Sequence, residues 1–123
     1  MIHYQLNDST FALGDTVQGS CQWFPSNNEE ARKIAKLTVG WRTEGRGDVD
    51  QTALYEAELR PQQTVHFKCD IPFNAHPSYD GELLRIIWEV RVDFVSTGLQ
   101  NIFGLGKSQD ARTFRVVAGR GQS

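Results

Sequence analysis

The sequence has no long apolar run, no basic leader and almost no excess of charge. No window approaches the roughly 18 to 20 unbroken apolar residues that a membrane-spanning helix needs. The first six residues, Met-Ile-His-Tyr-Gln-Leu, have neither the basic nor the apolar region of a secretory signal. A formal net charge of −2 argues against a nucleic-acid-binding surface or a polybasic membrane module. We therefore expect a cytoplasmic protein that binds no nucleic acid and does not insert into a membrane.

Cysteine and histidine are also scarce, with two and three residues. Cys21 and Cys69 lie on the apolar side of alternating segments, and the chain has no secretory signal, so we expect buried thiols rather than a disulfide. The histidines, His3, His66 and His76, stand singly, and none is spaced from a cysteine or another histidine as zinc ligands are. We predict no metal site and no cofactor.

No catalytic motif is complete. The sequence contains no Gly-x-Ser-x-Gly. Residues 101–108 resemble the end of a phosphate-binding loop, but Asn101 stands where a glycine is needed, and an alternating segment follows where a helix is needed. Asp48 and Asp50 lack the glycine and glutamate that a calcium loop would place after them. We therefore predict no enzyme activity and no catalytic residues.

What the chain has in abundance is alternation of apolar and polar residues. Every second residue from Leu84 to Phe94 is apolar. Arg85, Glu89, Arg91 and Asp93 fall on the other side, with Ile87 as the exception, and we predict this side to be a solvated sheet surface. Similar alternation occurs in residues 4–13, 16–23, 36–43, 52–59, 64–71 and 112–117, with turn-forming residues between them. About seven to eight strands with one apolar face each predict two antiparallel sheets packed face to face.

Three short patches carry a resemblance to a known family. Gly14–Gly19 reads Gly-Asp-Thr-Val-Gln-Gly, Ile71-Pro72 is followed by the turn Pro77–Gly81, and the long strand Leu84–Val92 comes next. Together they resemble the arrestin-like fold family, which includes arrestins, arrestin-domain trafficking adaptors, a retromer subunit and bacterial sporulation-control proteins. The resemblance implies an all-β, immunoglobulin-like or arrestin-like antiparallel β-sandwich over residues 1–117, with a flexible tail at 118–123.

The resemblance also implies a role: a non-enzymatic protein-binding module that acts as an adaptor or scaffold through edge strands or end loops. Arrestins have two such sandwiches and this chain has one. The paired lysines that sense receptor phosphates have no counterpart here, so receptor-phosphate recognition does not carry over.

The segment 96–107 is the predicted docking element. It places apolar side chains among glycines, and such side chains often mark an interface. The predicted partner-binding residues are Leu99, Ile102, Phe103 and Leu105. The partner would be another protein or a second copy of this chain in a homodimer. Alternatively, Phe103 and Leu105 fold back over the open end of the sandwich.

Two other functions stay open. An immunoglobulin-like or lectin-like module would bind a small molecule or glycan and would expose aromatic side chains on a concave sheet. Trp23, Trp41 and Trp88, however, fall on the predicted core side of their strands. An enzyme whose site is assembled from distant residues would need a polar pocket with a perturbed carboxylate or histidine.

Overall fold

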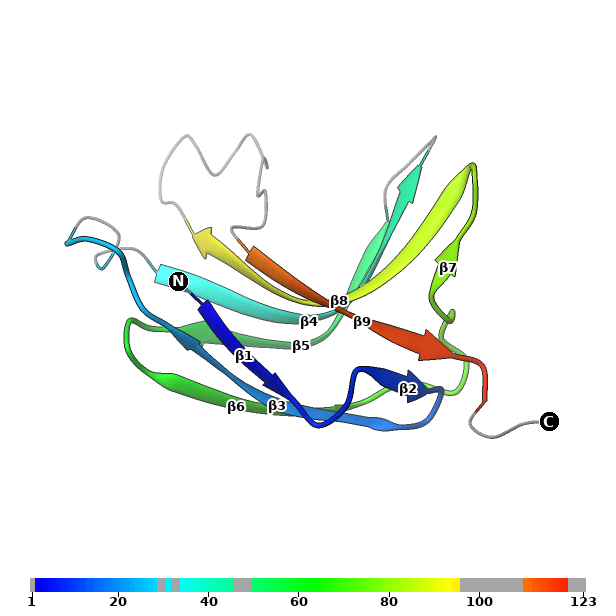
Figure 1. Cartoon of the computed structure of the whole chain (residues 1–123), viewed down its shortest axis with the longest axis horizontal. Helices are drawn as coiled ribbons and strands as arrows, with labels where there is room; N and C mark the ends of the chain where they lie inside the picture. Colours follow the sequence, from blue (N-terminus) through cyan, green and yellow to red (C-terminus); the bar gives the residue numbers. More distant parts are fainter. Residues whose placement is uncertain (1, 29–30, 32–33, 46–49, 96–109, 120–123) are drawn as a thin grey trace.

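The computed structural model describes residues 2–28, 31, 34–45, 50–95 and 110–119 (Figure 1). These residues form nine strands and no α-helix, and no helix among them is long and apolar enough to cross a membrane. The strands are β1 (Ile2–Leu6), β2 (Thr10–Ala12), β3 (Thr16–Trp23), β4 (Ile34–Gly45), β5 (Gln51–Leu59), β6 (Thr64–Asp70), β7 (Tyr79–Asp80), β8 (Leu84–Val95) and β9 (Asp110–Val117).

The strands form two sheets that pack face to face. The small sheet has the order β1-β3-β6, and the large sheet has the order β2-β9-β8-β4-β5, with β7 beside the first residues of β8. Figure 1 shows the small sheet lying along one face of the large one. All the pairings are antiparallel except that of β2 with β9. This confirms the predicted all-β sandwich. Two strands, β2 and β7, are too short to be recognised by alternation.

The core lies between the sheets and contains the side chains that alternation placed inward. The fully buried ones with the largest volumes include Trp23, Trp88, Phe11, Leu37 and Leu59. Both cysteines are free thiols, Cys21 buried and Cys69 half-buried, on the predicted side of their strands. Burying apolar surface of this kind is the main driving force for folding, at about 25 cal/mol per Å².

A β-bulge corrects one predicted side-chain direction. In the register of β4 with β5, Val39 pairs with Tyr55 but Gly40 pairs with Ala53, so Leu54 is the extra residue. Leu54 packs against the core, whereas Ala53 is exposed, although the even alternation of residues 52–59 predicts that it lies on the same inner side as Leu59. The inserted residue reverses the alternation for the rest of the strand, which an even two-residue period cannot reveal.

The large sheet extends beyond the small one. We call this extension the arm: it comprises Arg42–Gly45 of β4, Leu84–Ile87 of β8, and β7. In Figure 1 the end of β4 and the beginning of β8 rise away from β1, β3 and β6. The outer face of the large sheet therefore runs from the sandwich onto the arm without a break.

Candidate functional site

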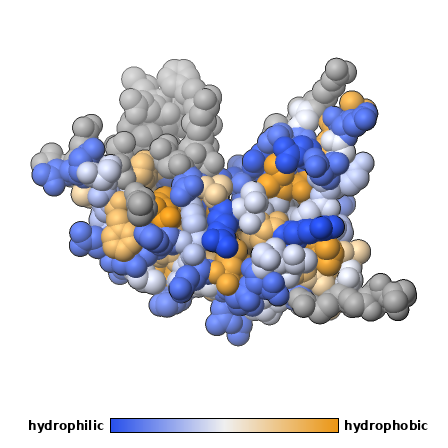
Figure 2. Space-filling view, viewed as in Figure 1, coloured by the Kyte–Doolittle hydropathy of each residue, from blue (hydrophilic) through white to orange (hydrophobic). Residues whose placement is uncertain are grey.

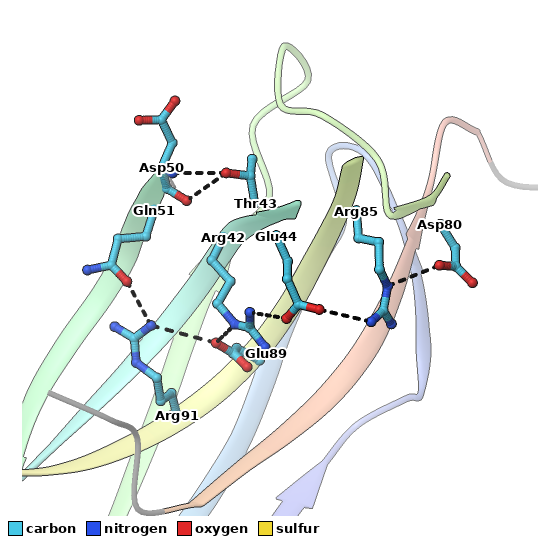
Figure 3. A network of polar contacts seen from close by, with 9 residues as sticks. All are labelled: Arg42, Thr43, Glu44, Asp50, Gln51, Asp80, Arg85, Glu89 and Arg91. Atoms are coloured by element: carbon cyan, nitrogen blue, oxygen red, sulfur yellow. Dashed lines mark hydrogen bonds and ion pairs between the residues drawn. The ribbon is translucent and has the colours of Figure 1, made fainter. Parts of the chain in front are cut away.

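A chain of alternating charges crosses the outer face of the large sheet and continues along the arm. Its seven members, here called the ion ladder, are Asp80, Arg85, Glu44, Arg42, Glu89, Arg91 and Asp93. Successive members are joined by ion pairs with nitrogen–oxygen distances of 3.0, 3.2, 2.8, 3.0, 3.6 and 3.0 Å. Figure 3 shows the six members from Asp80 to Arg91.

The ladder is exposed at the arm and buried over the sandwich. The side chain of Asp80 is 85% exposed, that of Arg91 is 17% exposed, and Glu89 as a residue is only 4% exposed. The predicted solvated surface is therefore wrong at Glu89 and largely wrong at Arg91 and Asp93. The reason is that Arg42 and Arg91 both point at Glu89 and shield its carboxylate from water (Figure 3).

Beside Glu89 the outer face is hollowed. The cross-strand row through Gly40 reads Ala53, Gly40, Glu89 and Thr113, whereas the flanking rows contain Arg91 and Arg42. A side chain at Gly40 would overlap the backbone carbonyl oxygen of Thr52, so this position must stay empty. The result is a hollow of about 190 Å³ in the part of the sheet that the structure describes.

The hollow is lined by two positively charged and two negatively charged residues. The positive residues are Lys36 and Arg91, and the negative residues are Glu56 and Glu89. Lys36 and Glu56 form an ion pair at 3.2 Å. Arg91 also donates to the side-chain oxygen of Gln51 at 3.0 Å. The lining is therefore neutral overall and already hydrogen-bonded, which favours neither a free anion nor a free cation as a ligand.

Two members of the ladder, Arg42 and Glu44, are unsuited to acid–base chemistry near neutral pH. The hydrogen bond from Arg42 holds the pKa of Glu44 below its usual value, and the same hydrogen bond raises the pKa of Arg42. Both shifts fix the charged forms, whereas a general acid or base needs a pKa close to the working pH. Among the described residues no group of three or more His, Cys, Asp or Glu side chains could hold a metal ion.

The candidate nucleophiles are held in their protonated forms. Burial raises the pKa of the Cys21 thiol to about 12 and that of the Cys69 thiol to about 11. Burial, followed by the nearby charge of Asp110, also raises the pKa of Tyr4. Since the thiolate is the reactive form of cysteine, both thiols are poor nucleophiles.

The arm and the turn that joins β7 to β8 carry exposed apolar side chains. Tyr79, Leu83 and Leu84 are 57%, 68% and 40% exposed. Ile86 pairs with Tyr79 across β7 and β8 and is partly buried against the core. We call Tyr79, Leu83, Leu84 and Ile86 the arm patch. Figure 2 shows hydrophobic residues at this end of the molecule.

The predicted partner-binding residues Leu99, Ile102, Phe103 and Leu105 lie outside the described residues. Of the three tryptophans, Trp23 and Trp88 are fully buried as predicted. Trp41 is partly buried and packs against the core, on the predicted side of its strand, and its ring meets that of His76 edge to face at 5.9 Å between centroids.

Sequence reasoning missed both the hollow and the arm patch. A glycine in the middle of an alternating strand, Gly40, was the available signal for the hollow, because interior strand glycines mark bulges and close backbone approaches. The pair Leu83-Leu84 was the signal for the arm patch, because two apolar residues in a row directly after a turn depart from the alternation of the strand that follows. The burial of Glu89 had no local signal.

Comparison with known proteins supports the fold. No protein-family model and no curated protein sequence matches the chain. Among solved structures, the chain is similar to the sporulation control protein Spo0M of Bacillus subtilis, with 16% identity and a TM-score of 0.50. The likeness covers 96% of this chain and 49% of Spo0M, so the chain spans about half the length of that protein. Sporulation-control proteins belong to the family that the sequence resembles, and the likeness therefore supports an arrestin-like fold.

Proposed function

We propose that this protein is a non-enzymatic, cytoplasmic protein-binding module of arrestin-like type that acts as an adaptor or scaffold. The observation that carries the proposal is the arm patch. Tyr79, Leu83 and Leu84 make up half of the six large apolar side chains that are exposed among the described residues. A cluster of apolar side chains that no second layer covers is typical of a surface that a partner protein covers.

The fold and the charges support the same proposal. The similar structure is a control protein by its name, and the hydrogen bond between Arg42 and Glu44 favours the charged form of both groups. A rim of charged groups around an apolar centre is the usual composition of a protein interface. Arg85 and Asp80 provide such a rim beside the arm patch, with their ion pair at 3.0 Å.

The test is affinity capture from a lysate of the source organism. The variant Leu83→Ser/Leu84→Ser removes the most exposed aliphatic side chains of the arm patch. Its matched control, Phe24→Ser/Ile34→Ser, removes two apolar side chains that are 38% and 49% exposed and lie outside the arm. All proteins must first show the same melting temperature, so that loss of binding is not loss of folding.

We expect the wild type and the control to capture the same partner and the arm variant to lose it. Equal capture by all three would contradict a role for the arm patch and leave the segment 96–107, tested by Phe103→Ser/Leu105→Ser, as the docking element. If the partner recovered is the chain itself, analytical ultracentrifugation of the wild type will show a dimer that the arm variant does not form.

Binding of a glycan is the second candidate, because the outer face has a hollow lined largely by polar side chains. Titration with methyl glycosides, followed through the backbone amide signals of Gly40 and Ala53, would show saturable shifts if the hollow held a sugar ring.

A further inference from the structure

The hollow beside Glu89 follows from the backbone geometry of the sheet. The bulge between Val39 and Gly40 brings β5 so close to β4 that no side chain can stand at Gly40. The facing residue, Ala53, contributes one methyl group. A gap therefore remains in the outer layer, and no rotamer change at these two positions can fill it.

The gap has the size of one aromatic ring. Its volume is about 190 Å³, and an engineered cavity of roughly 150 Å³ in another protein takes up benzene. Gly40, the buried Thr38 and Arg91 line it. A guanidinium group against an aromatic face is a favourable contact. The neutral balance of the lining favours an uncharged ring over a charged group.

Glu89 keeps a carboxylate oxygen that the ladder does not use. Arg42 donates a hydrogen bond to Oε2 of Glu89 at 3.0 Å and Arg91 forms an ion pair with the same oxygen at 3.6 Å, which leaves Oε1 to accept from a ligand. Gln51 uses its oxygen for Arg91 at 3.0 Å, so its amide nitrogen is the group that it can offer. An acceptor beside a ring-sized gap suits a phenol, whose hydroxyl group donates.

From these observations we infer that the hollow binds the side chain of a tyrosine presented by a partner protein. Tyrosine is enriched among the residues that carry most of the energy of protein interfaces, and such residues fill small desolvated pockets. The ring would lie over Gly40 between Ala53 and Arg91, and its hydroxyl group would donate to Oε1 of Glu89. The inference rests on the proposed protein-binding function and assigns it a second contact, separate from the arm patch.

The first experiment is an NMR titration of the full chain with N-acetyl-L-tyrosinamide, followed through the backbone amide signals. N-acetyl-L-phenylalaninamide, which lacks the hydroxyl group, and methyl glucoside are titrated in parallel. We expect saturable shifts at Gly40 and Ala53 with the tyrosine probe. The phenylalanine probe should bind about tenfold more weakly, which is the effect of losing one hydrogen bond to a charged group. The sugar should produce no shift at these signals.

A matched pair of variants then locates the site. Ala53→Phe places a ring inside the hollow, and Arg115→Phe places the same ring on an exposed position of β9 away from the hollow. We expect Ala53→Phe to lose at least tenfold in affinity for the tyrosine probe and Arg115→Phe to keep it. If Ala53→Phe does not fold, the comparison of the tyrosine and phenylalanine probes on the wild type still tests whether the hollow binds a tyrosine side chain.

Three results would overturn the inference: no saturable shift up to the solubility limit of the tyrosine probe, equal binding of the phenylalanine probe, or shifts at Gly40 with the sugar alone. The last would favour the glycan function. None of these results bears on the arm patch, because the arm variant Leu83→Ser/Leu84→Ser leaves the lining of the hollow intact. A failure of this inference is thus distinguishable from a failure of the proposed function.

Discussion

The two halves of β8 both alternate between apolar and polar residues, apart from Ile87 in the arm half, but they have opposite surroundings. In the sandwich half, Trp88, Val90 and Val92 are completely buried. In the arm half, Leu84 is 40% exposed and Ile86 is only partly buried. The difference arises because the small sheet covers the first set and ends before the second (Figure 1). Alternation therefore determines which way a side chain points, and the neighbouring layer determines whether it is buried.

On the outer face, the charged side chains of the ion ladder are exposed on the arm and more deeply buried over the sandwich. The acids and bases of the arm half, such as Arg85 and Asp80, are exposed as the pattern suggests. In the sandwich half Glu89 is buried although no layer covers that face in the described structure. Its burial comes from its own neighbours, because Arg42 and Arg91 converge on it from both sides. A polar face can thus acquire a partly desolvated centre without a second sheet.

We expect the largest difference between the sandwich and the arm from a matched pair of leucine substitutions. Leu37 of β4 is fully buried between the sheets, whereas Leu84 of β8 is on the arm. We expect Leu37→Ala to lower the free energy of unfolding by about 2–5 kcal/mol and Leu84→Ala by less than about 1 kcal/mol. Chemical denaturation of both variants measures this. Equal losses would mean that the arm is covered in solution.

Two glycine substitutions give the next largest contrast. Gly40→Ala directs a methyl group into the backbone oxygen of Thr52, so we expect a loss of about 1–3 kcal/mol or more in the free energy of unfolding. Gly81→Ala meets the tip of the Tyr79 ring, which is exposed and can turn away, so we expect less than about 0.5 kcal/mol. A Gly40→Ala variant as stable as wild type would contradict the bulge geometry.

The ion ladder provides a third contrast. Glu89→Ala leaves two partly buried guanidinium groups without their shared acceptor, and we expect a loss of about 1–3 kcal/mol in the free energy of unfolding. Glu44→Ala should cost much less, because water and salt replace an exposed carboxylate. Thermal unfolding at low and high salt measures both. The loss at Glu89 should persist at high salt, and a loss that salt abolishes would contradict its burial.

The smallest expected effect concerns the cysteines. Burial raises the pKa of both thiols, to about 12 for Cys21 and about 11 for Cys69, so the folded protein holds these protons more tightly than the unfolded chain. The contribution of the thiols to stability is therefore complete below pH about 8.5 and falls as the pH rises toward the folded values.

Thiol labelling at neutral pH with a disulfide reagent tests this prediction. We expect slow labelling of both thiols, with Cys69 ahead of Cys21 because Cys69 is only half-buried. The unfolded protein in denaturant provides the fast reference rate. Rapid labelling of Cys21 in the native state would show that the small sheet opens.

The sequence was sufficient for the sandwich because its information is local. Alternation in β3 and β8 predicts strands and their inner faces, and the structure follows it at Cys21, Trp23 and Trp88. The resemblance carried by Pro77–Gly81 and its neighbours agrees with the fold of the similar structure.

The candidate site could not be predicted because it depends on contacts across strands. The hollow exists because Gly40, Ala53 and Glu89 share one row of the large sheet, and that register follows from the bulge at Val39. The seven residues of the ladder come from β4, β7 and β8, which lie far apart in the sequence. Strand order and register are set by the whole sheet, so a single strand gives no sign of them.

The parallel pairing of β2 with β9 has a consequence for the time course of folding. Thr10–Ala12 pairs with Arg115–Val117, so this strand pairing joins segments that are about 105 residues apart in the sequence. During synthesis β1, β3 and β6 can associate early, but β2 must wait for β9 to emerge. Until then the inner side of Phe11, which is 2% exposed in the folded protein, remains open to solvent. The closing step thus has a high contact order, and the nascent chain passes through a period in which it is prone to aggregate.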